Sequence, residues 1–239
     1  MLGGIEPCSF IDFPGRVAAV LFLRGCNLQC RYCHNPQLIP RTGAGGGPDD
    51  GTLEFLQKRR GLLGGVVVTG GEPTLQARLP VLLEAVRSMG FAVKLDTNGT
   101  RPEVVGRLIA ERLLEYAAVD VKIAPGPGSR WLCGMETQAD TALETLGRLV
   151  GAGIPCEART TVAAGVHDLE GLRVLARKLA GAGVRLWRLQ PVEDTTVLDP
   201  SVPWRPPAPE ILSGAVAAAA SLGITVPGPG AGTRPRGAP

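Results

Sequence analysis

Three cysteines that lie within eight positions are the side chains in this sequence best suited to hold a metal centre. Cys26, Cys30 and Cys33 fall in the segment Arg24-Gly-Cys-Asn-Leu-Gln-Cys-Arg-Tyr-Cys-His-Asn-Pro36, and the whole chain has 6 cysteines. Closely spaced thiolates are typical ligands of iron–sulfur clusters and of transition metals. Because three thiolates leave one coordination position open, the segment predicts a centre that takes part in chemistry.

The elements around these cysteines follow a repeating pattern. The run Val17–Leu23 just before them is apolar and predicts a buried strand, so the thiols lie on a loop at its end. Residues 1–16 contain turn-forming residues and are expected to lead into that strand. Further strands are expected at 66–68, 91–95, 117–123, 156–162 and 184–189. Helices are expected at 52–63, 79–89, 102–114, 137–150, 168–180 and 209–222. Six strand-then-helix units in succession predict a parallel sheet with right-handed crossovers.

Polar residues mark the carboxyl ends of different predicted strands. They are Gly70–Pro73, Asp96–Gly99, Lys122, Arg159 and Gln190. In a barrel these ends meet at one mouth, whereas an open sheet would spread them along an edge. The sequence therefore predicts an α/β fold, a partial (β/α)6 TIM-like barrel with the cysteine loop after the first strand. Residues 1–225 are expected to form one domain, and the Gly- and Pro-rich stretch 226–239 a disordered tail.

The composition excludes some classes of partner. A net charge of +3 over 239 residues gives no argument for nucleic acid or a membrane surface. The N-terminus lacks the pattern of a signal peptide, and no apolar stretch has the length of a spanning helix. Clustered cysteines without a secretion signal favour metal binding over disulfides. We therefore expect a cytoplasmic protein that binds neither nucleic acid nor a membrane.

Two motifs together resemble the radical SAM superfamily. The spacing of Cys26, Cys30 and Cys33, with an aromatic residue before the last cysteine, resembles its cluster-binding signature. The segment Gly70-Gly-Glu-Pro73 resembles its motif for the methionine end of S-adenosylmethionine. The resemblance implies a [4Fe–4S] cluster held by the three cysteines, whose fourth iron binds S-adenosylmethionine. Reductive cleavage of that cofactor would then give a 5′-deoxyadenosyl radical.

Four stretches resemble one group within this superfamily, the anaerobic ribonucleoside-triphosphate reductase activating proteins, which are glycyl-radical-enzyme activases. They are Ser9–Gly15, Tyr32–Pro36, Gly70–Gln76 and Lys94–Gly99. The resemblance implies a radical SAM domain that generates a glycyl radical on a partner enzyme, the anaerobic ribonucleotide reductase. It also implies a flavodoxin- or ferredoxin-type protein as the reductant.

The same resemblance implies roles for single residues around the cofactor. Tyr32 would lie along the adenine, and Gly70, Gly71 and Glu72 would approach the methionyl amino group. A second set would lie beside the cofactor: Asp96, Thr97, Lys122 and Arg159. In some activases the Asp–Thr pair also holds a monovalent cation. The Arg would bind the cofactor's carboxylate, for which a guanidinium is a suitable bidentate partner.

The sequence also allows other interpretations of these residues. The cysteines could form a structural zinc site with His34, although its position next to Cys33 is awkward for tetrahedral closure. Tyr32 could simply pack under the loop, and Arg159 could form a surface ion pair. His167 is expected on the polar surface. The three isolated cysteines are expected to be small apolar residues: Cys8, Cys133 and Cys156.

A second function from the same superfamily also fits the two motifs. It is a radical SAM enzyme that acts on a small molecule, such as a 7-carboxy-7-deazaguanine synthase.

Overall fold

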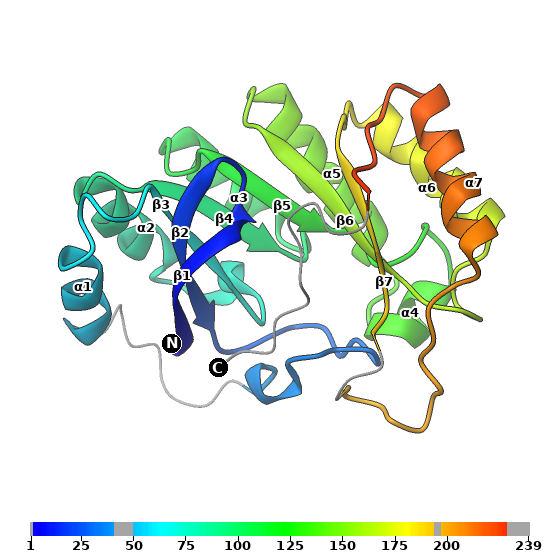
Figure 1. Cartoon of the computed structure of the whole chain (residues 1–239), viewed down its shortest axis with the longest axis horizontal. Coiled ribbons are helices and arrows are strands. Elements are labelled where there is room, and N and C mark those ends of the chain that lie inside the picture. The colour runs from blue at the N-terminus through cyan, green and yellow to red at the C-terminus, as the bar shows by residue number, and fades with distance from the viewer. Residues whose placement is uncertain (1, 41–49, 194–196, 229–239) are drawn as a thin grey trace.

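The computed structural model describes residues 2–40, 50–193 and 197–228 (Figure 1). Its centre is a seven-stranded sheet in which the strands follow chain order. The strands are β1 Leu2–Phe13, β2 Arg16–Leu23, β3 Gly65–Gly70, β4 Ala92–Thr97, β5 Tyr116–Asp120, β6 Cys156–Val162 and β7 Trp187–Pro191. Strands β2 to β7 are parallel, and β1 is antiparallel to β2. The sheet curls into part of a barrel (Figure 1), which confirms the predicted fold class.

Most helices lie between successive parallel strands and cover the outer face of the sheet, and the last one follows the final strand (Figure 1). They are α1 Asp50–Gln57, α2 Leu79–Ser88, α3 Pro102–Ala110, α4 Gly128–Cys133, α5 Gln138–Gly151, α6 Leu169–Gly181 and α7 Pro209–Ser221. In the described part of the chain, none of them is long and apolar enough to cross a membrane.

Alternate side chains of each strand enter two different apolar layers, because successive strand residues point to opposite faces. On β3, Val66 and Val68 pack in the large core between sheet and helices. Val67 points the other way and packs with Phe13 and Phe22 inside the curled sheet. Both faces of the strands are therefore buried, as expected for a parallel sheet.

Two elements were not predicted. Residues 2–13 form the edge strand β1, although Gly3, Gly4 and Pro7 give this stretch a turn-like composition. Its pairing with β2 contains register shifts, and most of its side chains are only half-buried, so it lacks a regular apolar alternation. The short helix α4 is the second element that was not predicted. The cysteine loop thus follows the second strand of the chain, which is the first of the six parallel strands.

Two helices end earlier than predicted. The helix expected at 52–63 ends at Gln57, and the one expected at 102–114 ends at Ala110. Of the expected tail, residues 229–239 lie outside the described residues.

Candidate functional site

Backbone hydrogen bonds hold the cysteine loop in place from two sides. On the sheet side, Gly25 N–H donates to Leu38 O at 2.7 Å, so the loop folds back on itself. Opposite, Gln29 N–H and Arg31 N–H donate to the carbonyls of Cys133 and Leu132 at the end of α4, both at 3.0 Å. The loop is therefore fixed by its own return and by α4.

The chain after β7 also contacts this loop. Leu198 N–H donates to Cys33 O at 3.1 Å and Asp199 N–H to Arg31 O at 2.9 Å. The Asp199 carboxylate accepts a further hydrogen bond from Arg31 Nη1 at 2.9 Å. Trp204 Nε1 donates to Asp199 O at 2.8 Å. The segment 198–204 thus holds the loop through both backbone and side-chain contacts.

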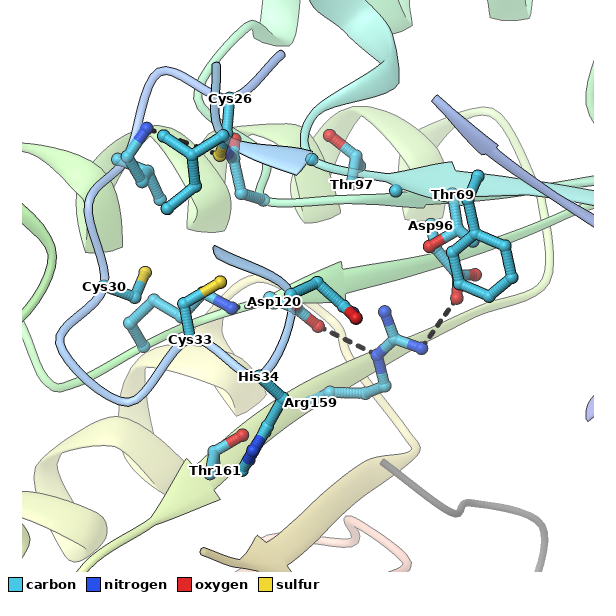
Figure 2. A pocket seen from close by; sticks show the side chains of 18 of the residues that line it. Cys26, Cys30, Cys33, His34, Thr69, Asp96, Thr97, Asp120, Arg159 and Thr161 are labelled. Atoms are coloured by element: carbon cyan, nitrogen blue, oxygen red, sulfur yellow. Dashed lines mark hydrogen bonds and ion pairs between the residues drawn. The ribbon is translucent and has the colours of Figure 1, made fainter. Parts of the chain in front are cut away.

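The three thiols line one pocket at the carboxyl ends of the strands. Figure 2 shows Cys30 and Cys33 with their sulfur atoms side by side and Cys26 facing them across a gap. Burial raises the pKa of Cys26 to about 11 and also raises the pKa of Cys33. The pKa of Cys30 is raised by its contact with the Cys133 thiol and by burial. The free thiols are therefore protonated near neutral pH, and an iron centre would displace those protons.

The arrangement suits a cluster better than a single ion. Among the described residues, no group of three or more His, Cys, Asp or Glu side chains is arranged to hold a metal ion. A zinc ion would require its ligands to converge on one point. The ligands of a [4Fe–4S] cluster bind separate iron atoms and can lie farther apart. His34 also points toward Thr161 and away from the thiols (Figure 2), which argues against a zinc site.

Five charged side chains of alternating sign run across β4, β5 and β6 and the residues just after β5. Arg159 lies at their centre: its Nη1 donates to Asp96 Oδ2 and its Nε to Asp120 Oδ1, both at 2.8 Å (Figure 2). Lys94 pairs with the other oxygen of Asp96, and Lys122 with that of Asp120. Arg159 is therefore part of a largely buried network and not of a surface ion pair.

This network fixes the ionisation of its members. Burial alone would raise the pKa of Asp120, but Arg159 and Lys122 hold it well below its usual range. Burial would likewise lower the pKa of Arg159, but Asp120 and Asp96 keep it well above its usual range. Lys94 is 2% exposed and was not predicted as a site residue. Its alternate spacing with Asp96 on one strand was the available signal.

Glu72 has a structural role that its motif did not reveal. Its carboxylate is fully buried and accepts hydrogen bonds from Thr74 N–H and Oγ, Thr97 Oγ and Asn98 N–H. Burial raises the pKa of Glu72, and these donors act against that rise. The side chain thus ties the end of β3 to the end of β4, and it does not line the pocket.

Gly70 and Gly71 allow a close approach between β3 and the cysteine loop. Gly70 has φ +126°, and a Cβ at this position would lie 2.2 Å from Leu23 O. A Cβ on Gly71 would lie 2.3 Å from Gly25 O. Both residues also line the pocket, which leaves their backbone open to a bound group.

Tyr32 lies between two of the cysteines and carries an unsatisfied hydroxyl. The side chain is 3% exposed, and its ring packs edge-on against Trp204 with centroids 5.6 Å apart. Within the described residues its hydroxyl has no hydrogen-bond partner. Such a buried group costs about 1–3 kcal/mol unless something binds it. Because Tyr32 also lines the pocket, a bound group there would fit the chemistry of the site.

One prediction on an isolated residue was wrong. His167 is buried and not on the surface: its Nδ1 accepts from Ala163 N–H at 3.1 Å, and its Nε2 lies 2.9 Å from Lys122 O. The prediction for Cys133 is confirmed: it is a buried apolar residue, and it packs in the same cluster as Cys30. Both depend on the loops after β5 and β6, whose paths the sequence did not indicate.

Comparisons with known proteins agree with this geometry. A protein of Methanocaldococcus jannaschii, named as a candidate glycyl-radical enzyme activating enzyme, is 39% identical over 125 residues, 51% of this chain and 50% of that protein. A pyruvate formate-lyase-activating enzyme of Clostridium pasteurianum is 34% identical over 105 residues, 40% of this chain and 42% of that protein. A 7-carboxy-7-deazaguanine synthase of Methanopyrus kandleri is 32% identical over 131 residues, 46% and 51% of the two chains. The chain thus spans about half the length of these relatives.

Solved structures share the fold. A domain of a pyruvate-formate lyase-activating enzyme from Bacteroides vulgatus superposes with a TM-score of 0.58 at 22% identity, covering 69% of this chain and 98% of that domain. The structure of anSMEcpe with bound AdoMet and a peptide gives a TM-score of 0.62 at 14% identity, covering 87% of this chain and 63% of that one. The family model described as the radical SAM superfamily matches residues 20–176. The chain therefore belongs to the radical SAM superfamily, whose enzymes use a [4Fe–4S] cluster and S-adenosylmethionine.

Proposed function

We propose that this protein is a glycyl-radical-enzyme activase and that its partner is an anaerobic ribonucleoside-triphosphate reductase. The observation that carries the proposal is the pocket itself. The three thiols of one loop face the buried charge network around Arg159 across that pocket. A cluster on the thiols and a zwitterionic cofactor beside it would use both groups.

Each residue has a proposed task in this pocket. Cys26, Cys30 and Cys33 hold the cluster. The backbone of Gly70 and Gly71 approaches the methionyl amino group, while Glu72 fixes the turn that presents it.

The charged residues act on the cofactor's other groups. Arg159 uses Nε and Nη1 for Asp120 and Asp96, which leaves Nη2 for the cofactor's carboxylate. Asp96 and Thr97 lie beside the cofactor, and Lys122 adds positive charge near the thiols.

When bound, the cluster and S-adenosylmethionine supply one-electron cleavage of the sulfonium to methionine and a 5′-deoxyadenosyl radical. The protein's own residues bind, orient and exclude water. Cys30 is buried and Cys26 and Cys33 are half-buried, and the segment 198–204 covers the cysteine loop through Arg31 and Cys33. An electron donor of the flavodoxin or ferredoxin type would deliver the electron.

A protein substrate is supported by where one of the activase-like stretches lies. Ser9–Gly15 belongs to β1 and the turn after it, and Asp12 lines the same pocket as the thiols. Ser9 Oγ donates a short hydrogen bond to the Asp12 carboxylate. The stretch is thus placed where a segment of a protein substrate could reach the cofactor.

The test is an anaerobic activation assay. The reconstituted protein, a reductant, S-adenosylmethionine and the reductase are combined, and the reductase is examined by EPR. A glycyl radical doublet on the reductase is expected, and it should be absent when Cys30→Ala replaces the wild type. Cofactor cleavage without a doublet would reject the partner.

The 32% identity to a 7-carboxy-7-deazaguanine synthase supports a second candidate. In that case 5′-deoxyadenosine would form with a small-molecule substrate and without any partner protein.

A further inference from the structure

We propose that the hydroxyl of Tyr32 donates a hydrogen bond to a sulfur of the iron–sulfur cluster and thereby raises the cluster's reduction potential. This inference rests on the cluster in the proposed function. It concerns an atom, the phenolic oxygen, whereas the sequence pointed only to the aromatic ring.

The hydroxyl of Tyr32 is buried without a hydrogen-bond partner among the described residues. Tyr32 is 3% exposed, and within the described part of the chain its oxygen is the only buried side-chain N or O atom without a hydrogen-bond partner. Nearly all buried polar groups in proteins are satisfied, so an exception points to a missing partner. The ring itself is fixed by its edge-on contact with Trp204. The hydroxyl is therefore held in place without a partner among the described residues.

Tyr32 is also adjacent to the proposed cluster ligands. Tyr32 lies on the cysteine loop between Cys30 and Cys33, and it lines the pocket together with both. Its hydroxyl is also close enough to interact electrostatically with four side chains, Lys122, Cys30, Asp120 and Cys133. The Lys and Asp of this set are paired with each other. A cluster held by Cys30 and Cys33 would therefore lie in the same pocket that Tyr32 lines.

The expected effect follows from charge. A hydrogen bond to a cluster sulfur stabilises the reduced cluster more than the oxidised one, because the reduced cluster carries the greater negative charge. Removal of the hydroxyl should therefore move the midpoint potential to more negative values. The ring remains in Tyr32→Phe, so packing on Trp204 is kept.

The chain offers a matched control, since its other tyrosine has a partner. Tyr116 donates from its hydroxyl to Glu157 Oε2 at 3.3 Å. It lies on β5, away from the cysteine loop. Tyr116→Phe should therefore lower the stability of the metal-free chain and leave the cluster potential unchanged.

The experiment uses the full chain in two states. In the metal-free state, urea unfolding of Tyr32→Phe should give a stability equal to or above that of the wild type. A clear loss of stability would show that the hydroxyl already has a partner in the protein and would overturn the inference. In the reconstituted state, without S-adenosylmethionine, an EPR redox titration should show the negative shift.

The remaining outcomes separate the causes of failure. An unchanged potential with the same iron and sulfide content as the wild type overturns the inference. A change confined to the affinity for S-adenosylmethionine overturns it too, because the cofactor would then be the partner. A wild-type chain that assembles no cluster overturns the proposed function, and the inference with it.

Discussion

Arg159 on β6 donates a hydrogen bond from Nε to Asp120 Oδ1 on β5 at 2.8 Å, and the same guanidinium reaches Asp96 on β4, two strands away. One planar group thus joins two carboxylates, which a single ammonium could not do in the same geometry. We expect Arg159→Lys to weaken S-adenosylmethionine binding about 10–100-fold, the equivalent of a lost charge-assisted hydrogen bond of about 1.5–3 kcal/mol. Equilibrium binding of S-adenosylmethionine to the reconstituted protein measures this loss of affinity. The exposed Arg177, paired with Glu170, supplies the control Arg177→Lys, and equal affinities of the two variants would contradict the role.

Cys30→Ala should abolish the brown colour and broad visible absorption of the anaerobically reconstituted protein. The reason is that two thiolates are too few to hold the cluster. Iron and sulfide analysis measures the loss. Cys156→Ala is the matched control, because this partly buried cysteine begins β6 and does not line the pocket. Retention of a full cluster by Cys30→Ala would remove Cys30 from the ligand set.

Glu72→Gln should destabilise the metal-free protein by about 1–3 kcal/mol. All the groups that contact the Glu72 carboxylate are donors. The NH2 group of a glutamine would therefore face an N–H or O–H group, and that donor would lose its acceptor. Urea unfolding gives the difference in the free energy of unfolding. The exposed Glu84 on α2 provides the control Glu84→Gln, which should change little. A neutral result for both variants would show that the Glu72 contacts can be replaced.

Gly71→Ala and Gly147→Ala should act in opposite directions. At Gly71 the new methyl would meet Gly25 O at 2.3 Å, which displaces the cysteine loop and lowers cluster content. A Cβ added to Gly147, inside α5, would meet no atom within 4 Å apart from the backbone of its own helix. Alanine should therefore stabilise the protein by about 1 kcal/mol through helix propensity. Thermal unfolding and iron content measure both effects. Normal cluster assembly in Gly71→Ala would mean that the loop can move without cost.

His167 should make the stability of the metal-free protein depend on pH. Because Nδ1 accepts from Ala163 N–H, the ring is neutral with its proton on Nε2, which donates to Lys122 O. Burial lowers the pKa of His167, so around pH 6.5 the unfolded chain binds more protons than the folded chain. The stability from this group is present above that pH and is lost as the pH falls.

The comparison of wild type with His167→Gln tests this. The variant can keep one donor and one acceptor but does not titrate. Urea unfolding above and below pH 6.5 should therefore show that the difference in the free energy of unfolding between wild type and variant changes with pH. A constant difference would mean that His167 has the same pKa in both states.

Local sequence was enough to predict the parallel strands and the cysteine loop. Strands such as β3 are short apolar runs closed by glycine, and Cys26, Cys30 and Cys33 lie so close in sequence that their grouping needs no long-range contact. Strand β1 was missed because its residues are half-buried and irregularly paired, so no alternation marked it. Its conformation comes from hydrogen bonds to β2.

The sequence by itself determined which residues could hold a cluster, because ligand type and spacing are local properties of the chain. Only the tertiary structure decided what those residues meet. Arg159 and Asp96 are 63 positions apart, and they join because β4, β5 and β6 lie side by side. The burial of His167 and the unpartnered hydroxyl of Tyr32 likewise depend on loops that arrive from distant parts of the chain. Such contacts are set by packing of the whole sheet, and no short stretch of sequence encodes them.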